Sequence, residues 1–157
     1  MQTIESLIKD HPFWDGLPEQ FIPLVAECAT LRTYDAREQV FMKGHTADEF
    51  YLILSGHVVL ETPFIPGEGV ITVQTLGEGE AFGWSWLFFP HQWHFTARSI
   101  EPTETIVFDA IRLRELAEKN PLFGYKLALR VADVMMQRLQ VTRSRLLTLC
   151  EATHQTA

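Results

Sequence analysis

Between Leu31 and about Asp109 the chain is a succession of short apolar runs that are separated by Gly, Pro and Asp residues. The runs read EQVFMK, DEFYLILSG, HVVLETPF, VITVQTLG, FTARSI and TETIVFDA. Several short segments of this composition, at such regular spacing, predict an all-β sandwich or roll. A chain of 157 residues is about the size of one domain, so we expect these strands to form one β-rich body.

Helical patterns flank the β region on both sides. Residues 3–9 predict a short helix, and residues 19–29 predict an amphipathic one. The apolar positions of the second are Phe21, Ile22, Leu24, Val25 and Cys28. From Ile111 onward the pattern is helical again, and Pro121 suits the first position of a helix. A long final helix is therefore expected from about Leu122 to Leu149.

We expect a single domain over residues 1–157, mainly β with flanking helices. Its parts are N-terminal helices over 1–30, a β-roll over 31–110, C-terminal helices over 111–150 and a tail over 151–157. No run of 18 apolar residues and no secretory signal appears, so a cytoplasmic protein that does not bind membranes is expected. Cys28 and Cys150 lie far apart and suit a reducing compartment.

The net charge of −7 is unevenly distributed. Residues 1–111 hold 5 Lys and Arg against 16 Asp and Glu, whereas residues 112–157 hold 8 against 4. An acidic body disfavours nucleic-acid binding, which needs a basic face. In the basic segment, Arg143 and Arg145 suit the C-terminal end of a helix. We therefore expect no direct DNA binding.

The predicted long helix carries two apolar stripes. One consists of Leu129, Ala132, Met136, Leu139, Leu146 and Cys150, and the other includes Phe123, Leu127, Val131, Val134 and Val141. A helix on the surface of a monomer needs one stripe. The second stripe predicts a parallel homodimer through residues 122–149. The alternative is a helix that its own domain covers on both sides.

The segment from Gly44 to Val58, GHTADEFYLILSGHV, resembles a signature of the cyclic nucleotide-binding domain. Residues 76–83, LGEGEAFG, resemble the approach to that family's phosphate-binding cassette, and residues 119–121 and 138–142 are similar to its C-terminal helical region. The chain is thus identified as a single-domain member of the CRP/FNR-like superfamily that lacks the helix-turn-helix. The resemblance implies a double-stranded β-helix, or jelly roll, with a long C-terminal dimerisation helix.

The cassette departs from the family pattern, which reads Phe-Gly-Glu-x-Ala-Leu, a loop, then Arg-x-Ala. The resemblance implies that Trp84 replaces the Glu that accepts from a ribose hydroxyl, and that Trp86 replaces a small residue beside the phosphate. It also implies that Trp93 replaces the Arg that pairs with the phosphate. An indole cannot form that charged pair, so binding of 3′,5′-cyclic AMP is expected to weaken by a factor of about 10 to 150.

The candidate ligand-binding residues are Phe82, Gly83, Trp84, Ser85, Trp86, Leu87, Trp93, His94, Phe95, Thr96, Arg98, Thr142 and Arg143. Trp86 decides between two readings of this cassette. If its indole points inward, we expect the pocket to be at least partly filled by the protein's own side chains. If it points outward, Trp84, Trp93 and Phe95 line a cavity for an aromatic ligand.

These residues predict a non-enzymatic ligand-sensing regulatory module. The effector is expected to be a cyclic nucleotide or another small anionic or aromatic molecule, bound between the roll and the long helix. No cofactor beyond this effector is assigned. Only eight residues follow Leu149, so no DNA-reading motif is expected and the output is expected to pass through an unknown protein partner.

Two alternatives remain. One is a ligand-free interaction and dimerisation module whose pocket is filled by tryptophans. The other is a cupin-like metalloenzyme, suggested by the pair His45 and Glu49 and disfavoured because Lys43 stands where that motif needs a second His. No catalytic residue and no metal ligand is therefore expected.

Overall fold

The computed structural model describes residues 2–63 and 69–155. The helical elements are α1 (Ile4–Asp10), η1 (Pro12–Trp14), η2 (Glu19–Phe21), α2 (Ile22–Ala26), η3 (Trp84–Leu87), α3 (Ala110–Lys119) and α4 (Pro121–Gln155). The strands are β1 (Ala29–Tyr34), β2 (Gln39–Phe41), β3 (Glu49–Ser55), β4 (Val58–Pro63), β5 (Val70–Leu76), β6 (Ala81–Phe82), β7 (Thr96–Ser99) and β8 (Thr103–Asp109).

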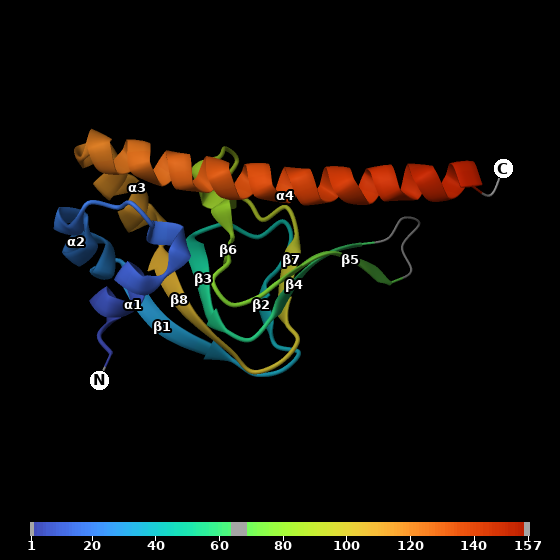
Figure 1. Cartoon of the computed structure of the whole chain (residues 1–157). Helices are drawn as coiled ribbons and strands as arrows, with labels where there is room; N and C mark the ends of the chain where they lie inside the picture. The colour runs from blue at the N-terminus through green and yellow to red at the C-terminus, as the bar shows by residue number, and fades with distance from the viewer. Residues whose placement is uncertain (1, 64–68, 156–157) are drawn as a thin grey trace.

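The strands form two four-stranded antiparallel sheets, in the orders β1-β8-β3-β6 and β2-β7-β4-β5. The N-terminal helices and α3 gather at the end of the roll beside the first sheet, and α4 lies across both sheets (Figure 1). Tyr51 shows how the first sheet is paired, since it lies opposite Val107 of β8 on one side and Phe82 of β6 on the other. This arrangement confirms the predicted β-roll with flanking helices.

Two element boundaries differ from the prediction. The amphipathic segment over 19–29 divides into η2 and α2, and Ala29 already belongs to β1, where it pairs with Phe108. Strand pairing over the whole of β1 overrides the helical pattern there. At the other end, residues 151–155 belong to α4 and not to a tail. Phe64, at the end of the predicted strand HVVLETPF, lies outside the described residues.

The core joins the roll to the first third of α4. Phe123, Leu127 and Val131 are buried, as expected for a stripe of the long helix that packs on its own domain. Gly124 lets this part of α4 lie close to α3, because a Cβ at this position would be 2.9 Å from the carbonyl oxygen of Ala117. The stripe that contains Leu129, Met136 and Leu146 is exposed in this single chain.

Beyond Val131, α4 continues over the second sheet and along the β4–β5 hairpin (Figure 1). Arginine side chains hold the helix in place through backbone carbonyls of the body. Arg130 donates to Phe13 over 2.6 Å, Arg138 donates to Ala81, and Arg145 donates to Val73 over 3.1 Å. No helix within the described ranges is long and apolar enough to cross a membrane.

Candidate ligand-binding site

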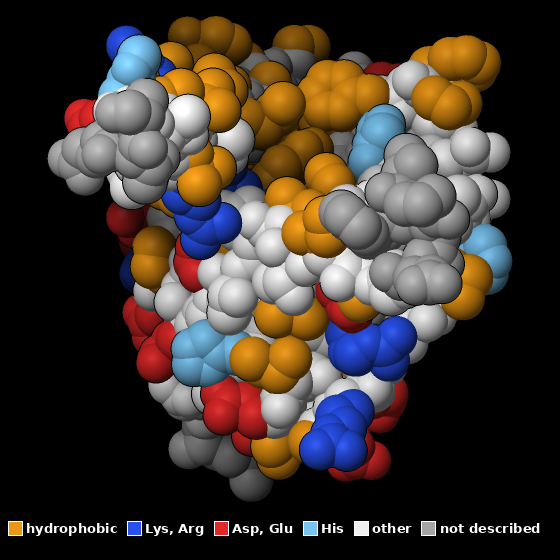
Figure 2. Space-filling view, turned by 90° about the vertical axis from the view of Figure 1, so that its right-hand side faces the viewer, with side chains coloured by type: hydrophobic (Ala, Val, Ile, Leu, Met, Phe, Trp, Pro, Cys, Tyr) orange, Lys and Arg blue, Asp and Glu red, His pale blue; other side chains and the backbone are white. Residues whose placement is uncertain are grey.

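A cavity of about 590 Å³ lies between the second sheet, the cassette and α4. It is lined by Phe41, Leu60, Val73, Gln74, Gly83, Trp84, Ser85, Trp93, His94, Phe95, Met135, Met136, Arg138, Leu139 and Thr142. Figure 2 shows that hydrophobic side chains gather around a recess in the upper part of this face, at the level of α4, whereas charged side chains lie mainly below it. The volume falls within the usual range for small-molecule sites.

The turn after β6 separates the two cassette tryptophans. Gly83 has a φ of 87°, a left-handed conformation that favours glycine, and η3 begins immediately after it. A 3₁₀ helix has three residues per turn, so side chains two positions apart point in different directions. Trp84 consequently lines the cavity, whereas Trp86 turns into the core.

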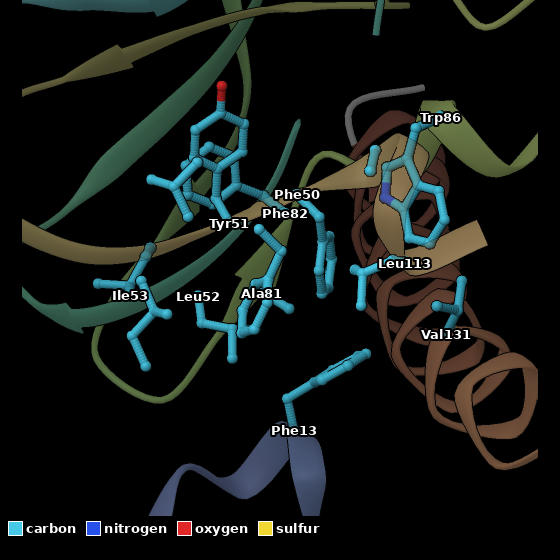
Figure 3. Packing of buried hydrophobic residues seen from close by; sticks show 14 of the residues in the cluster. Phe13, Phe50, Tyr51, Leu52, Ile53, Ala81, Phe82, Trp86, Leu113 and Val131 are labelled. Carbon is cyan, nitrogen blue, oxygen red and sulfur yellow. The ribbon is translucent and has the colours of Figure 1, made fainter. Parts of the chain in front are cut away.

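Trp86 is 0% exposed, and its ring centroid lies 5.9 Å from that of Phe50. Figure 3 shows its indole turned toward the helices that carry Leu113 and Val131, and away from Tyr51. Its Nε1 is buried without a hydrogen-bond partner among the described atoms. The expectation that an inward Trp86 would fill the ligand pocket is therefore wrong, because this indole fills the core behind the cassette and leaves the cavity open.

Trp93 forms an aromatic wall where the resemblance places the phosphate-pairing Arg. Its ring stacks on Phe41, with centroids 3.8 Å apart and an interplanar angle of 11°. Its backbone is also fixed, since its N–H donates to the carbonyl of His45 and its carbonyl accepts from the N–H of Gly44. The indole is thus held as a rigid apolar surface against this side of the cavity.

The polar groups of the cavity are few. The Ser85 hydroxyl lies 3.0 Å from Nδ1 of His94, and both residues line the space. The guanidinium carbon of Arg138 lies 4.3 Å from the ring centroid of Trp84, a cation–π contact. Burial lowers the pKa of Arg138 to about 10. Among the described lining residues, Arg138 is the one that carries a permanent charge.

The structure brings together only part of the candidate set. Gly83, Trp84, Ser85, Trp93, His94, Phe95 and Thr142 line the cavity. Phe82 and Trp86 belong to the core, and Leu87 packs against its edge. Arg98 points to the neighbouring strand, where it pairs with Glu61 over 3.0 Å, and Arg143 is exposed on α4. The hydroxyl of Thr96 accepts from the N–H of Lys43 over 3.1 Å.

The sequence pattern did not identify the lining residues of the strands or most of those of α4. These are Phe41, Leu60, Val73, Gln74, Met135, Met136, Arg138 and Leu139. A signal for Arg138 was available, since it lies four residues before Thr142 and so on the same helix face. The strand residues had no such signal, because alternation does not reveal which strands become neighbours.

The metalloenzyme alternative depends on whether further metal-ligating side chains lie beside His45 and Glu49. Within residues 2–63 and 69–155, no group of three or more His, Cys, Asp and Glu side chains is placed to hold a metal ion. Glu49 forms an ion pair with Arg32 over 2.8 Å and accepts from the hydroxyl of Tyr51 over 3.2 Å. Glu49 therefore has a structural role between β1 and β3.

Comparison with known proteins agrees with this architecture. Residues 31–120 match the family model of the cyclic nucleotide-binding domain. A Geobacter metallireducens GS-15 protein described as cyclic nucleotide-binding is 27% identical, with 88% of this chain and 99% of that chain covered and a TM-score of 0.77. The catabolite activator protein of Thermus thermophilus is also 27% identical, with 88% and 63% covered and a TM-score of 0.68.

A more distant match shows the fold alone. It is the regulatory domain of Toxoplasma gondii PKA in complex with cAMP, at 18% identity and a TM-score of 0.68, with 83% of this chain and 49% of that chain covered. The family match carries more weight, since it extends from β1 to the end of α3 and includes most of the cassette side of the cavity. This protein therefore belongs to the cyclic nucleotide-binding domain family.

Proposed function

We propose that this protein is a non-enzymatic ligand-sensing regulatory module whose effector is not a standard 3′,5′-cyclic nucleotide. The observation that supports this most directly is the cavity of about 590 Å³ between the roll and α4. A ligand in it would contact Met135 and Leu139 of the helix together with Trp93 and Phe95 of the roll. Its affinity would then depend on the position of the helix, which is the condition for a population shift.

The chemistry of the cavity disfavours a cyclic nucleotide. A ribose hydroxyl would meet the indole of Trp84 in place of a carboxylate, and the phosphate would meet the Phe41–Trp93 stack. Charge-assisted hydrogen bonds to a phosphate are about twice as strong as neutral ones, and an indole offers a single neutral donor. The ligand-free alternative is less well supported, because Trp86 lies in the core and the cavity stays open.

We also propose that two copies associate in parallel through α4. The positions Leu129, Ala132, Met136, Leu139, Arg143, Leu146 and Cys150 follow one another at alternating spacings of three and four residues. This is the a/d pattern of a coiled coil. Met136, Leu139 and Leu146 are each at least 60% exposed in the single chain, so they are available to a second helix. The output is proposed to pass through contact of this helix pair with a partner protein.

Calorimetry with 3′,5′-cyclic AMP tests the nucleotide part of the proposal. We expect a dissociation constant well above about 1 μM, because the charged partner of the phosphate is missing from the cassette. A dissociation constant below that value would contradict the claim that Trp84 and Trp93 disable the nucleotide site.

Ligand-dependent melting tests whether the cavity binds any small molecule. A library of metabolites is compared on the native protein and on Thr142→Trp, in which an indole occupies the cavity rim. Ser144→Trp is the matched control, because Ser144 lies on the same exposed stretch of α4 but does not line this cavity. We expect compounds that raise the melting temperature of the native protein and of Ser144→Trp but not of Thr142→Trp. A library without any such compound would favour the ligand-free interaction module.

A further inference from the structure

Arg138 is a cation, and only some of its N–H donors have hydrogen-bond partners among the described residues. One nitrogen of the guanidinium donates to the carbonyl of Ala81, and the face of the group lies over Trp84. The other terminal nitrogen, Nη1, is buried without a hydrogen-bond partner among the described atoms. A guanidinium has five N–H donors and no acceptor, so Nη1 keeps donors that no described side chain or backbone group satisfies.

The charge of Arg138 is also weakly compensated. Glu80 is the acidic residue that acts on it, but its carboxylate is exposed and accepts from the N–H of Gly77 over 2.7 Å. Desolvation outweighs this attraction, which is why the pKa of Arg138 is lowered. A buried charge without a partner is unfavourable, and an anion inside the cavity would remove that penalty.

Apart from Gln74, Ser85, His94 and Thr142, the rest of the cavity lining is aromatic and apolar. Trp84, Trp93 and Phe95 supply flat faces from the cassette side, and Met135 and Met136 supply adaptable side chains from α4. Stacking on such faces favours a planar ligand. A phosphate monoester carries close to two negative charges and three acceptor oxygens, and the described lining offers one guanidinium for them. A carboxylate carries one charge, and its two oxygens match the guanidinium fork.

We propose that the effector of this cavity is an aromatic monocarboxylate whose carboxylate pairs with Arg138 while its ring lies among the cassette aromatics. This inference rests on the ligand-sensing function proposed above and specifies the ligand class. Because Arg138 belongs to α4 and the aromatic faces belong to the roll, the two ends of the ligand bind different elements. The bound ligand would thereby add a charged contact between the helix and the roll.

Calorimetry with defined probes tests the ligand class. The probes are benzoate, indole-3-acetate and 2-naphthoate, with 2-naphthamide as the neutral isostere of the last. On the native protein we expect at least one carboxylate to bind, and 2-naphthoate to bind about 10- to 100-fold more tightly than 2-naphthamide, the effect of one charge-assisted pair. This comparison needs no variant, so it holds even if a substitution prevents folding.

Arg138→Gln removes the charge and keeps a side-chain amide that can donate to Ala81. Its matched control is Arg145→Gln, since Arg145 also donates from α4 to a backbone carbonyl, that of Val73, but does not line the cavity. We expect Arg138→Gln to weaken carboxylate binding about 10- to 100-fold and to leave 2-naphthamide binding nearly unchanged. Arg145→Gln should bind every probe like the native protein.

The outcomes separate this inference from the function on which it rests. Equal affinity for 2-naphthoate and 2-naphthamide, or carboxylate binding that survives Arg138→Gln, would overturn the assignment of Arg138 and leave ligand sensing intact. A second outcome is that none of the three carboxylates binds, but another compound raises the melting temperature of the native protein and not of Thr142→Trp. That outcome would overturn the ligand class alone. Failure of the carboxylates and of the whole library would overturn both.

Discussion

Trp93 lies flat on Phe41, with ring centroids 3.8 Å apart and planes inclined by 11°. The contact joins the loop before β7 to strand β2, two segments that lie far apart in the sequence. Both rings are buried and both line the cavity. The stack therefore stabilises the fold and shapes the site at the same time.

The first prediction concerns the stability that this stack provides. Trp93→Ala should lower the free energy of unfolding by about 3–5 kcal/mol, because it removes a large buried aromatic group. Phe89→Ala is the control, since Phe89 is 91% exposed and its loss should change stability by less than about 0.5 kcal/mol. Urea denaturation measures both. Similar losses for the two variants would mean that Trp93 is not packed as described.

The second prediction separates Trp86 from ligand binding. Trp86→Ala should cost about 3–5 kcal/mol of stability, because it empties a fully buried core position. Trp86→Phe should cost clearly less, since it keeps a ring and removes an indole N–H that has no partner among the described atoms. Neither variant should gain binding of 3′,5′-cyclic AMP in calorimetry. A gain in Trp86→Ala would show that this indole does restrict the nucleotide site.

The third prediction uses Cys150 to test the parallel arrangement of two α4 helices. Cys150 is exposed at a seam position, so in a parallel dimer the Cys150 residues of two copies would face each other. Mild oxidation should then produce a disulfide-linked dimer on a non-reducing gel. Cys150→Ser should prevent the link even though Cys28 remains, because Cys28 is buried.

Sedimentation of Leu146→Arg provides the independent test of the dimer. Leu146 lies on the same seam and outside the cavity, so an Arg there should yield monomers without altering the site. Native protein that sediments as a monomer at tens of micromolar, about the range of a modest interface, would contradict the dimer. A dimer that resists cross-linking at Cys150 would contradict its parallel orientation.

The fourth prediction concerns pH and His11. Nδ1 of this buried imidazole accepts from the N–H of Phe13 over 3.2 Å, and Nε2 lies 3.1 Å from the carbonyl of Ile53. The neutral ring satisfies both contacts. In a protonated ring, Nδ1 would carry a hydrogen that faces the N–H of Phe13, so this hydrogen bond would be lost. Burial lowers the pKa of His11 below its ordinary value of 6.5.

The unfolded chain therefore binds this proton more readily than the folded protein does. The contribution of His11 to stability should be complete above pH 6.5 and should decrease as the pH falls from 6.5 through the lowered folded-state pKa. Urea denaturation at pH 7.5 and pH 5.5 should show this loss, and His11→Asn should reduce it. The exposed His154 offers the control variant His154→Gln. A loss that persists unchanged in His11→Asn would assign it to other groups.

Much of the fold could be predicted from local pattern. Alternation of apolar residues marked most of the strands, and Pro121 marked the start of α4. Short-range signals failed where pairing decided the structure, as at Ala29, which lies in a helical pattern but pairs with Phe108 in the sheet. The two-residue strand β6 carries too little pattern to be detected, and it forms because β3 offers it a partner.

The sequence by itself determined that this is a β-roll with a long helix of two apolar stripes, and that tryptophans stand where the family pattern has a Glu and an Arg. Only the tertiary structure decided which tryptophan reaches the cavity. Trp84 and Trp86 look equivalent along the chain, but a 3₁₀ turn sends one to the cavity and the other to the core. The same holds for Arg138, whose surroundings come from segments more than fifty residues away. Periodicity records which face of an element is apolar, whereas a cavity depends on which distant faces meet.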